Sequence, residues 1–501
     1  MISSYYRDKW STLKTQIITP HDFARLAQQI AYSFMDAYLK DCHYEENYID
    51  LLCEMTTFSE DSDLSGMAAR ALFGIIIESL CDDFEDLQTD TYNRVMAQII
   101  SYCRKLRGAK KLDRRLQDFQ IYSRTDLLTR IARIREDGKI LSRQRNVVKI
   151  LLLSRVTIGA DVVITSIIIQ RLAKLFPAAE LVLIGGDKLD EIYGGNQNIR
   201  LRRVAYNRQG GLLGRLASWQ SVLDIIDREL AACPLSNTIL IDPDSRLSQL
   251  GVLPIIDPDH YFFFDSRSAV SFSDNLSMAQ LTNAWLNKIT GEKEFCHSMV
   301  WPLPSNLQKA AQLRAKLKSN GARRVITLNF GVGGNPRKKV GRRLEQDLLL
   351  NLLQEPGTVI LLDKGFGDEE LQNTNELLAM IEDCGHAVRH AAFSGDLDTN
   401  LNRGVIGLQT HIGEIAALIA NSDEYIGYDS ACQHIAAALQ IPCLTIFAGS
   451  NNMRFIRRWS AFGSNTSRIV HVDTLSDRSA IDVEGIISRI MNERKIDHSG
   501  V

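Results

Sequence analysis

The stretch VVKILLLSRVTIGADVVITSIIIQRLAKLFPAAELVLIGG, residues 147–186, decides the fold class. An apolar run at 147–154 precedes an apolar-faced segment at 162–176, and a second apolar run follows at 180–186. Short apolar runs of this kind predict strands that are buried on both faces, and the longer segment between them predicts a helix. The order strand, helix, strand is a βαβ unit, which is typical of a parallel sheet.

The same alternation continues towards the C-terminus. Strands are expected at 238–242 and 260–265, and a second unit of the same kind begins near Arg323. In that second unit we expect strands at 324–330, 357–363, 387–390, 424–428 and 443–449, with helices at 344–353, 369–383, 414–420 and 430–439. The sequence therefore predicts two Rossmann-like, doubly wound α/β domains that face a cleft, with ligands at the carboxyl ends of the strands.

The N-terminal part has a different pattern. Through 21–40, 67–80 and 92–106 apolar residues recur at helical spacing, and neither strand-like alternation nor a glycine-rich loop interrupts them. We therefore expect three domains. They are an all-α domain of unknown role at 1–140, a Rossmann-like acceptor domain at 141–312 and a Rossmann-like donor domain at 313–501.

Composition excludes several classes of protein. Of the 501 residues, 45% are hydrophobic and 24% are charged, and the formal net charge of -2 gives no indication of nucleic-acid binding. The apolar runs are too short to cross a bilayer, and the polar N-terminus does not resemble a secretory signal. The nine cysteines lack a CxxC pair, so we expect reduced, buried thiols, a cytoplasmic location and no cysteine-bound metal.

The first strand–helix turn carries a candidate catalytic residue. Gly159 permits a tight turn, and Asp161 is expected at the start of the following helix, at the edge of the cleft. An aspartate there commonly serves as a helix N-cap, and spacing alone favours that interpretation. The functional alternative is a general base, because an ordinary aspartate is ionised at neutral pH and can accept a proton from a hydroxyl.

The segment FGVGGNPRKK, residues 330–339, is a candidate phosphate-binding loop. Its glycines could form a backbone nest for phosphate, with the adjacent cations as counter-charges. The residues concerned are Gly331, Gly333, Gly334, Arg337, Lys338 and Lys339. The spacing matches neither a dinucleotide fingerprint nor a P-loop, and a glycine-rich turn with solvated lysines is an equal alternative.

The most specific motif is GYDSACQHIAAALQIPCLTIFAGS, residues 427–450. A strand ends at Tyr428, Asp429 and Ser430 form the turn, and a helix of small residues follows. Ser430 can cap this helix, whose free N–H groups would attract a diphosphate. His434 lies one turn into the helix and is either a packed histidine or a ligand contact.

Two patterns resemble metal sites. The sequence IDPD occurs at 241–244 and 256–259, but its prolines favour turns over an Asp-x-Asp metal site. His386 and His390 would share a face only on a helix, and their segment looks extended. We therefore predict no metal site and no cofactor.

A basic stretch lies in the helical part of the chain. It could contact an anionic lipid or acceptor, although a solvated helix face is the favoured interpretation. It consists of Arg104, Lys105, Arg107, Lys110, Lys111, Arg114 and Arg115. We therefore expect at most a peripheral membrane contact.

Taken together, residues 147–475 resemble the family 9 glycosyltransferases, the lipopolysaccharide heptosyltransferase group. The resemblance rests on KILLLSRVTIGADVVITS in the first Rossmann-like unit and YDSACQHIAAALQIPCLTIFAG in the second. The latter is similar to the family pattern D-[ST]-G-x-x-H-x-x-A-A-L followed by a strand. The family implies a GT-B fold, inversion at the sugar and a nucleotide-activated donor, which is ADP-heptose for its founding members.

The resemblance also implies roles for individual residues. Asp161 corresponds to the proposed catalytic base, and Lys338 or Lys339 approximates a lysine that contacts phosphate. The donor-site motif corresponds to Asp429, Ser430 and His434. Two departures are visible: Gly159-Ala160-Asp161 stands where the family commonly has Gly-Asp, and Ala431 replaces a glycine.

We therefore expect a metal-independent glycosyltransferase of the heptosyltransferase type. It would move a heptose or hexose-like sugar from a nucleotide-diphosphate donor to a hydroxyl of a glycan or glycolipid acceptor, such as lipopolysaccharide. A base for the acceptor and positive groups for the departing diphosphate suffice for that chemistry. Two alternatives remain: a GT-B sugar-nucleotide epimerase, and a non-catalytic scaffold that acts through its helical domain.

Overall fold

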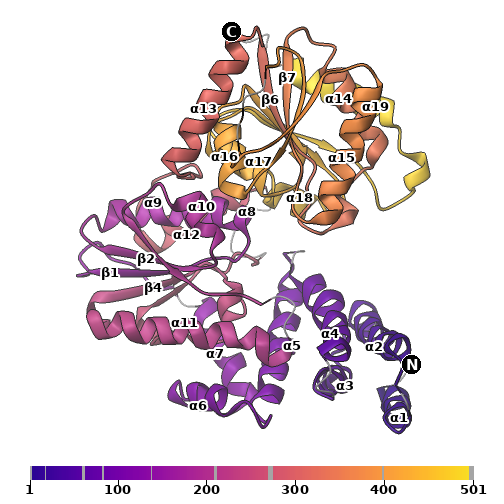
Figure 1. The fold of residues 1–501 in the computed structure, drawn as a ribbon. Helices are drawn as coiled ribbons and strands as arrows, with labels where there is room; N and C mark the ends of the chain where they lie inside the picture. Colours follow the sequence, from indigo (N-terminus) through magenta and orange to yellow (C-terminus); the bar gives the residue numbers. More distant parts are fainter. Residues whose placement is uncertain are drawn as a thin grey trace.

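The computed structural model describes residues 3–16, 18–58, 62–81, 84–136, 138–207, 211–268, 275–395, 397 and 400–495. A helical region, residues 3–136, comes first and is followed by two α/β domains, each built on a parallel sheet (Figure 1). The first domain holds β1 to β5 and the second holds β6 to β12. This arrangement confirms the predicted fold class.

The described residues of the helical region form helices, as the apolar spacing predicts. The helices are α1 (Ser3–Leu13), α2 (Pro20–Asp41), α3 (Glu46–Thr56), α4 (Ser62–Arg70), the π-helix η1 (Ala71–Ile77), α5 (Asp86–Cys103), α6 (Lys110–Asp118) and α7 (Arg124–Glu136). Helix α2 shows why the chain folds this way. Thr19 caps it by accepting from the Asp22 N–H, Pro20 occupies its first position, and apolar residues three or four apart are buried.

The first α/β domain has a sheet in the order β3-β2-β1-β4-β5. Its strands are β1 (Lys149–Leu153), β2 (Glu180–Gly185), β3 (Ile199–Arg203), β4 (Thr238–Asp242) and β5 (Tyr261–Phe263). Its longer helices are α9 (Ser166–Leu175), α10 (Lys188–Tyr193), α11 (Leu212–Ala232) and α12 (Met278–Thr290). Every residue of β1 and β4 is buried, which confirms that these apolar runs are covered on both faces.

The second α/β domain has a sheet in the order β12-β11-β10-β6-β7-β9-β8. Its strands are β6 (Arg324–Asn329), β7 (Thr358–Asp363), β8 (Val388–Ala392), β9 (Gly404–Gln409), β10 (Glu424–Tyr428), β11 (Cys443–Phe447) and β12 (Ser467–His471). Its helices are α13 (Pro304–Ser319), α14 (Arg342–Leu352), α15 (Asp368–Asp383), α16 (Ile412–Ala420), α17 (Ala431–Ala438), α18 (Met453–Arg458) and α19 (Val483–Lys495). The strands that the sequence predicts here are confirmed, and β9 and β12 are additional.

Apolar side chains form cores that cross the expected domain boundaries. One core joins the helical region to the first sheet, so that Trp10 and Ile134 belong to the same cluster as Leu151 and Leu240. A second core joins helices of the first domain to α16 and α17 of the second domain. The helical region thus shares its buried surface with the first α/β domain. The boundaries at residues 140 and 312 stay predictions.

Candidate active site

The turn after β1 differs from a regular strand–helix junction. A short helix, α8 (Ile158–Ala160), leads into a π-helical turn, η3 (Asp161–Thr165), before α9 begins. A π-helical turn holds one more residue than an α-helical turn, and such turns are frequent at functional sites. The helix after β1 is therefore irregular at the residue that the sequence indicates as a candidate base.

Asp161 lies inside the protein and not at an open edge. Only 1% of its surface is exposed, and its carboxylate accepts three hydrogen bonds. Ser154 Oγ donates to Oδ2 at 2.8 Å, while the Arg155 N–H and Thr165 Oγ1 donate to Oδ1 at 2.8 and 2.7 Å. Burial raises the pKa of Asp161 to about 6, against the opposing effect of these donors. The group can accept a proton, but an acceptor hydroxyl reaches it only if the surrounding helices move.

The position of Asp161 corrects one expectation. The N-cap of α8 is Thr157, whereas Asp161 follows α8 as the first residue of η3, so Asp161 is not an N-cap. Its carboxylate instead binds back to the loop that follows β1, through Ser154 and Arg155. It therefore fixes the shape of this loop, whatever further role it has.

Helix α17 begins where the sequence predicts, and the first domain packs against its start. Ser430 is the N-cap, and its side chain accepts from the Cys432 N–H at 3.4 Å. A Cβ atom at Gly159 would lie 3.4 Å from the Ala431 Cα and 3.0 Å from the His434 Cδ2. The small residues at this contact therefore let α8 and α17 approach closely, which is a structural reason for them besides ligand access.

Asp429 is held by the protein's own groups. Lys338 forms an ion pair with its Oδ2 atom, and Gln433 Nε2 donates to its Oδ1 atom at 2.5 Å. Thr445 in turn donates to Gln433 Oε1 at 2.9 Å. Asp429 thus holds the β10–α17 turn, and its negative charge already neutralises one of the two predicted phosphate-binding lysines.

The glycine-rich loop is only partly available as an anion nest. The Gly331 N–H donates to Asn329 Oδ1 at 3.0 Å, and the Val332 N–H donates to Glu370 Oε1 at 3.1 Å. Gly333 and Gly334 are exposed and have φ angles of 61° and 84°, which favour glycine. The open part of the predicted nest is therefore its tip.

Lys339 is the more available of the two lysines. It is half-buried, and within the part of the chain that the structure describes it forms no ion pair. Burial raises the pKa of the nearby Glu345, and the positive charge of Lys339 partly opposes this rise. The two lysines thus differ in their surroundings, although the sequence treats them alike.

His434 is buried beside the contact between the domains. Only 4% of its surface is exposed, and it lies edge-on to Trp459 with ring centroids 6.2 Å apart. Burial lowers the pKa of His434 to about 4, so that the ring is neutral at pH 7. Its Nδ1 atom has no hydrogen-bond partner among the described residues, which leaves one buried nitrogen able to bind a further group.

The structure adds a polar cluster that the sequence analysis missed. Asp363 ends β7, and it accepts from Asn329 Nδ2 at 2.5 Å and from Thr410 Oγ1 at 2.7 Å. Burial raises its pKa to about 6. Glu370 joins two loops by accepting from the N–H groups of Val332 and Phe366. All these groups follow the carboxyl ends of strands, which is the signal that could have identified them.

The patterns that resemble metal sites have other roles. Asp242 accepts from the Ser245 N–H and from Tyr261, Asp257 caps a short 3₁₀ helix, and His390 lies in β8. Within the described residues, no group of three or more His, Cys, Asp and Glu side chains could hold a metal ion. The nine cysteines are free thiols, but Cys42 and Cys384 are exposed and Cys296 is only half-buried, so the expectation of burial is wrong for those three.

The basic stretch is partly used inside the protein. Arg104 pairs with Asp113, while Lys111 and Arg115 pair with Asp224 and Asp227 of α11. The pairs of Lys111 and Arg115 tie the helical region to the first α/β domain, and all three pairs reduce the cationic surface. Among the described residues, no helix is long and apolar enough to cross a membrane.

Comparison with known proteins identifies the region around α17. Residues 385–476 match the model of glycosyltransferase family 9, the heptosyltransferases. We call residues 385–476, which match this family model, the family 9 segment. This family 9 segment extends from β8 to β12 and includes Asp429, Ser430, Ala431 and His434, but not Asp161 or the glycine-rich loop. The match confirms the predicted resemblance over residues 385–476, and the two parallel sheets confirm the predicted pair of Rossmann-like domains.

Solved structures with a similar fold include a family 9 glycosyltransferase from Veillonella parvula DSM 2008. It is 14% identical, with a TM-score of 0.48, and the alignment covers 69% of this chain and 96% of that one. E. coli heptosyltransferase WaaC with ADP is 12% identical, with coverages of 69% and 99% and a TM-score of 0.44. E. coli ADP-heptose lipopolysaccharide heptosyltransferase II is 12% identical, with coverages of 69% and 98% and a TM-score of 0.43. No curated protein matches the chain.

Proposed function

We propose that this protein is an inverting glycosyltransferase of the heptosyltransferase type. It transfers a heptose or hexose-like sugar from a nucleotide-diphosphate donor to a hydroxyl of a glycan or lipopolysaccharide-type acceptor. The observation that carries the proposal is the family 9 segment, whose most specific motif forms the β10–α17 turn. That turn meets the loop of the first domain that carries Asp161.

The two domains divide the chemistry between them. Asp161 takes the proton from the acceptor hydroxyl, whose oxygen attacks the anomeric carbon as the bond to the diphosphate breaks. The N–H groups at the start of α17 and the lysines of the 331–339 loop stabilise the departing diphosphate. Lys338 takes part by exchanging Asp429 for phosphate, whereas Lys339, which forms no ion pair among the described residues, binds directly.

This division requires the domains to separate and close again. In the structure α8 lies directly against the start of α17, and Asp161 is buried. Donor and acceptor therefore enter when this contact opens, and closure afterwards excludes water from the reacting groups. Because lysines and a helix terminus supply the positive charge, the proposal requires no metal ion.

The non-catalytic alternative has specific support. The carboxylate of Asp161 already accepts three hydrogen bonds, and Lys338 is already paired. A scaffold would retain these contacts permanently and bind no donor. The proposal and this alternative therefore differ in one measurable property, the affinity for nucleotide sugars.

The deciding experiment is a thermal-shift screen of the full chain against ADP-, UDP- and GDP-linked sugars, followed by product analysis. A donor at about 100 times its Kd should stabilise the protein by about 2.7 kcal/mol. Stabilisation together with transfer to an added glycan supports the proposal. Conversion of the donor alone to an epimer would indicate the epimerase instead. If no nucleotide sugar changes the thermal stability, the result would support the non-catalytic scaffold.

A further inference from the structure

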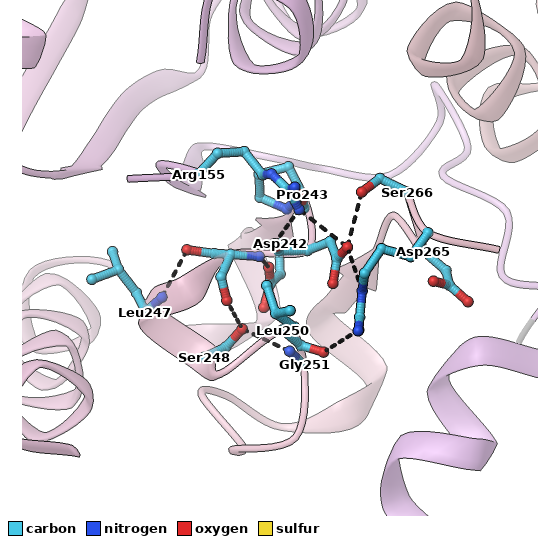
Figure 2. A network of polar contacts seen from close by, with 12 residues as sticks. Arg155, Asp242, Pro243, Leu247, Ser248, Leu250, Gly251, Asp265 and Ser266 are labelled. Carbon is cyan, nitrogen blue, oxygen red and sulfur yellow. Dashed lines mark hydrogen bonds and ion pairs between the residues drawn. The ribbon is translucent and has the colours of Figure 1, made fainter. Parts of the chain in front are cut away.

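The helical region contacts the first α/β domain at the edge that carries the candidate base. This edge is formed by the segments after β1, β4 and β5, which hold a buried polar network (Figure 2). The centre of the network is Asp244, which is fully buried in the segment that follows β4. The Asp244 side chain thus lies between the sheet edge that carries Asp161 and the helices of the N-terminal region.

Asp244 binds two arginines. Its Oδ2 atom lies 3.1 Å from Arg155 Nη1 and 3.0 Å from Arg267 Nε, and Ser266 Oγ donates to the same atom at 2.9 Å. Asp244 has a φ angle of 63°, a left-handed conformation that aspartate tolerates better than most residues. A buried carboxylate with these partners resists displacement, because moving it would leave the buried Arg267 and the half-buried Arg155 without this ion pair.

Arg155 connects the network to the candidate base. Its guanidinium donates to the Pro243 carbonyl at 3.0 Å and also to the Asp244 carbonyl, so the side chain is fixed on the β4 side. Its backbone N–H donates to Asp161 Oδ1 at 2.8 Å. The position of this one residue therefore sets both the pairing of Asp244 and the orientation of Asp161.

The opposite side of the network belongs to the helical region. The Arg267 guanidinium lies over the Tyr92 ring of α5, 4.8 Å from the ring centroid, and both residues are buried. Next to it, Arg135 of α7 donates to Asp265 Oδ2 at 2.6 Å and to Asp90 Oδ1 at 2.6 Å. Continuous contacts thus run from Tyr92 through Arg267, Asp244 and Arg155 to Asp161.

We propose that the helical region positions the general base, and that Tyr92, Arg267, Asp244 and Arg155 are the positioning residues that hold the Asp161 loop. The inference rests on the proposed function of Asp161 and assigns a role to the helical region. Tyr92 supplies a fixed face for Arg267, which keeps Asp244 in place for Arg155. A small displacement of a base relative to the reacting hydroxyl is enough to lower the rate of proton transfer.

A purely structural role for Tyr92 predicts different behaviour. If α5 only fills the core, then removing the Tyr92 ring would destabilise the fold but leave each folded molecule fully active. Phe34 of α2 offers a matched control, because it is equally buried in the same core and contacts Tyr44 instead of Arg267. The conservative variant Tyr92→Phe retains the ring beneath Arg267.

The kinetic test compares Tyr92→Leu, Tyr92→Phe and Phe34→Leu in the full chain, with a donor found in the nucleotide-sugar screen. For Tyr92→Leu we expect a fall in kcat of about tenfold or more with an unchanged donor KM, whereas the other two variants retain kcat. In the Asp161→Asn background, Tyr92→Leu should have no further effect on kcat. Equal loss in Tyr92→Leu and Phe34→Leu, or an undiminished effect in the Asp161→Asn background, would overturn the inference.

A second measurement does not depend on transfer activity. Hydrogen exchange of the peptide that spans 154–165 should be faster in Tyr92→Leu than in the unsubstituted protein and unchanged in Phe34→Leu. If the protein transfers no sugar but exchange accelerates as expected, the proposed function fails while the positioning of the loop is supported. If transfer occurs but exchange and kcat do not respond to Tyr92→Leu, the inference fails while the proposed function is unaffected.

Discussion

Replacement of Asp161 by Asn should change how the stability of the protein depends on pH. The carboxyl group is buried, and burial raises its pKa from 3.8 to about 6. Since the folded state binds this proton more tightly than the unfolded state, the free energy of unfolding falls as the pH rises through this range. A pKa difference of about two corresponds to about 3 kcal/mol, the destabilisation that ionised Asp161 contributes above pH 6.

The amide introduced by Asp161→Asn keeps the shape of the side chain but cannot ionise, so this variant should lack the pH dependence. We expect its free energy of unfolding, relative to the unsubstituted protein, to increase by about 2 kcal/mol between about pH 4.5 and 7.5. Urea unfolding of both proteins across this range measures the difference, in which the other titrating groups cancel. A constant difference would refute the raised pKa, and a change of opposite sign would mean that the three donors dominate over burial.

The same variant tests the catalytic assignment. Asp161→Asn should bind the donor nearly normally but transfer sugar at least about 100 times more slowly, the usual scale for a lost general base. Calorimetry with the donor and an assay of transfer under saturating donor separate the two effects. Full transfer activity in the folded variant would falsify the assignment of Asp161 as the base.

Three further results are expected. Replacing Lys338 and Lys339 together by Ala should weaken binding of the diphosphate nucleotide, at about 1.5–3 kcal/mol per charge-assisted contact, and should also destabilise the fold by leaving Asp429 unpaired. Unchanged affinity in calorimetry would remove both lysines from the site. Activity should survive EDTA, and loss of activity that Mn²⁺ or Mg²⁺ restores would contradict the metal-free mechanism. The His434 ring should stay neutral from about pH 5.5 to 8 in NMR spectra, because its pKa is about 4, and a titration near the ordinary histidine value of about 6.5 would show that the ring is solvated.

The sequence predicted strands where burial is uniform. In β1 and β4 every residue is buried, so that composition alone indicates the strand. Two of the missed strands are edge strands, namely β3, which carries three arginines, and β12. The third, β9, is buried but contains two glycines, and the edge strand β8 was predicted although most of it is not buried. Edge strands are covered less completely, and their composition approaches that of a loop.

The sequence alone does not predict which side chains bind each other when they lie far apart along the chain. The spacing of the glycine-rich loop suggested free N–H groups and free lysines, but Glu370 binds Val332 from 38 residues away and Asp429 binds Lys338 from 91 residues away. The π-helical turn at Asp161 likewise contacts α17, which is distant in the sequence. Local patterns therefore located the candidate site, while the charges that compete for it came from distant parts of the chain.

The core shared by the helical region and the first sheet has a consequence for synthesis of the chain. The ribosome produces α1 to α7 first, whereas Leu240 of the same core, in β4, emerges about a hundred residues later. During that interval the part of the helices' apolar surface that packs against the first sheet is not yet covered by β4, the condition in which chains associate wrongly or bind chaperones. Chains truncated just after α7 should therefore aggregate more readily than chains that extend beyond β5.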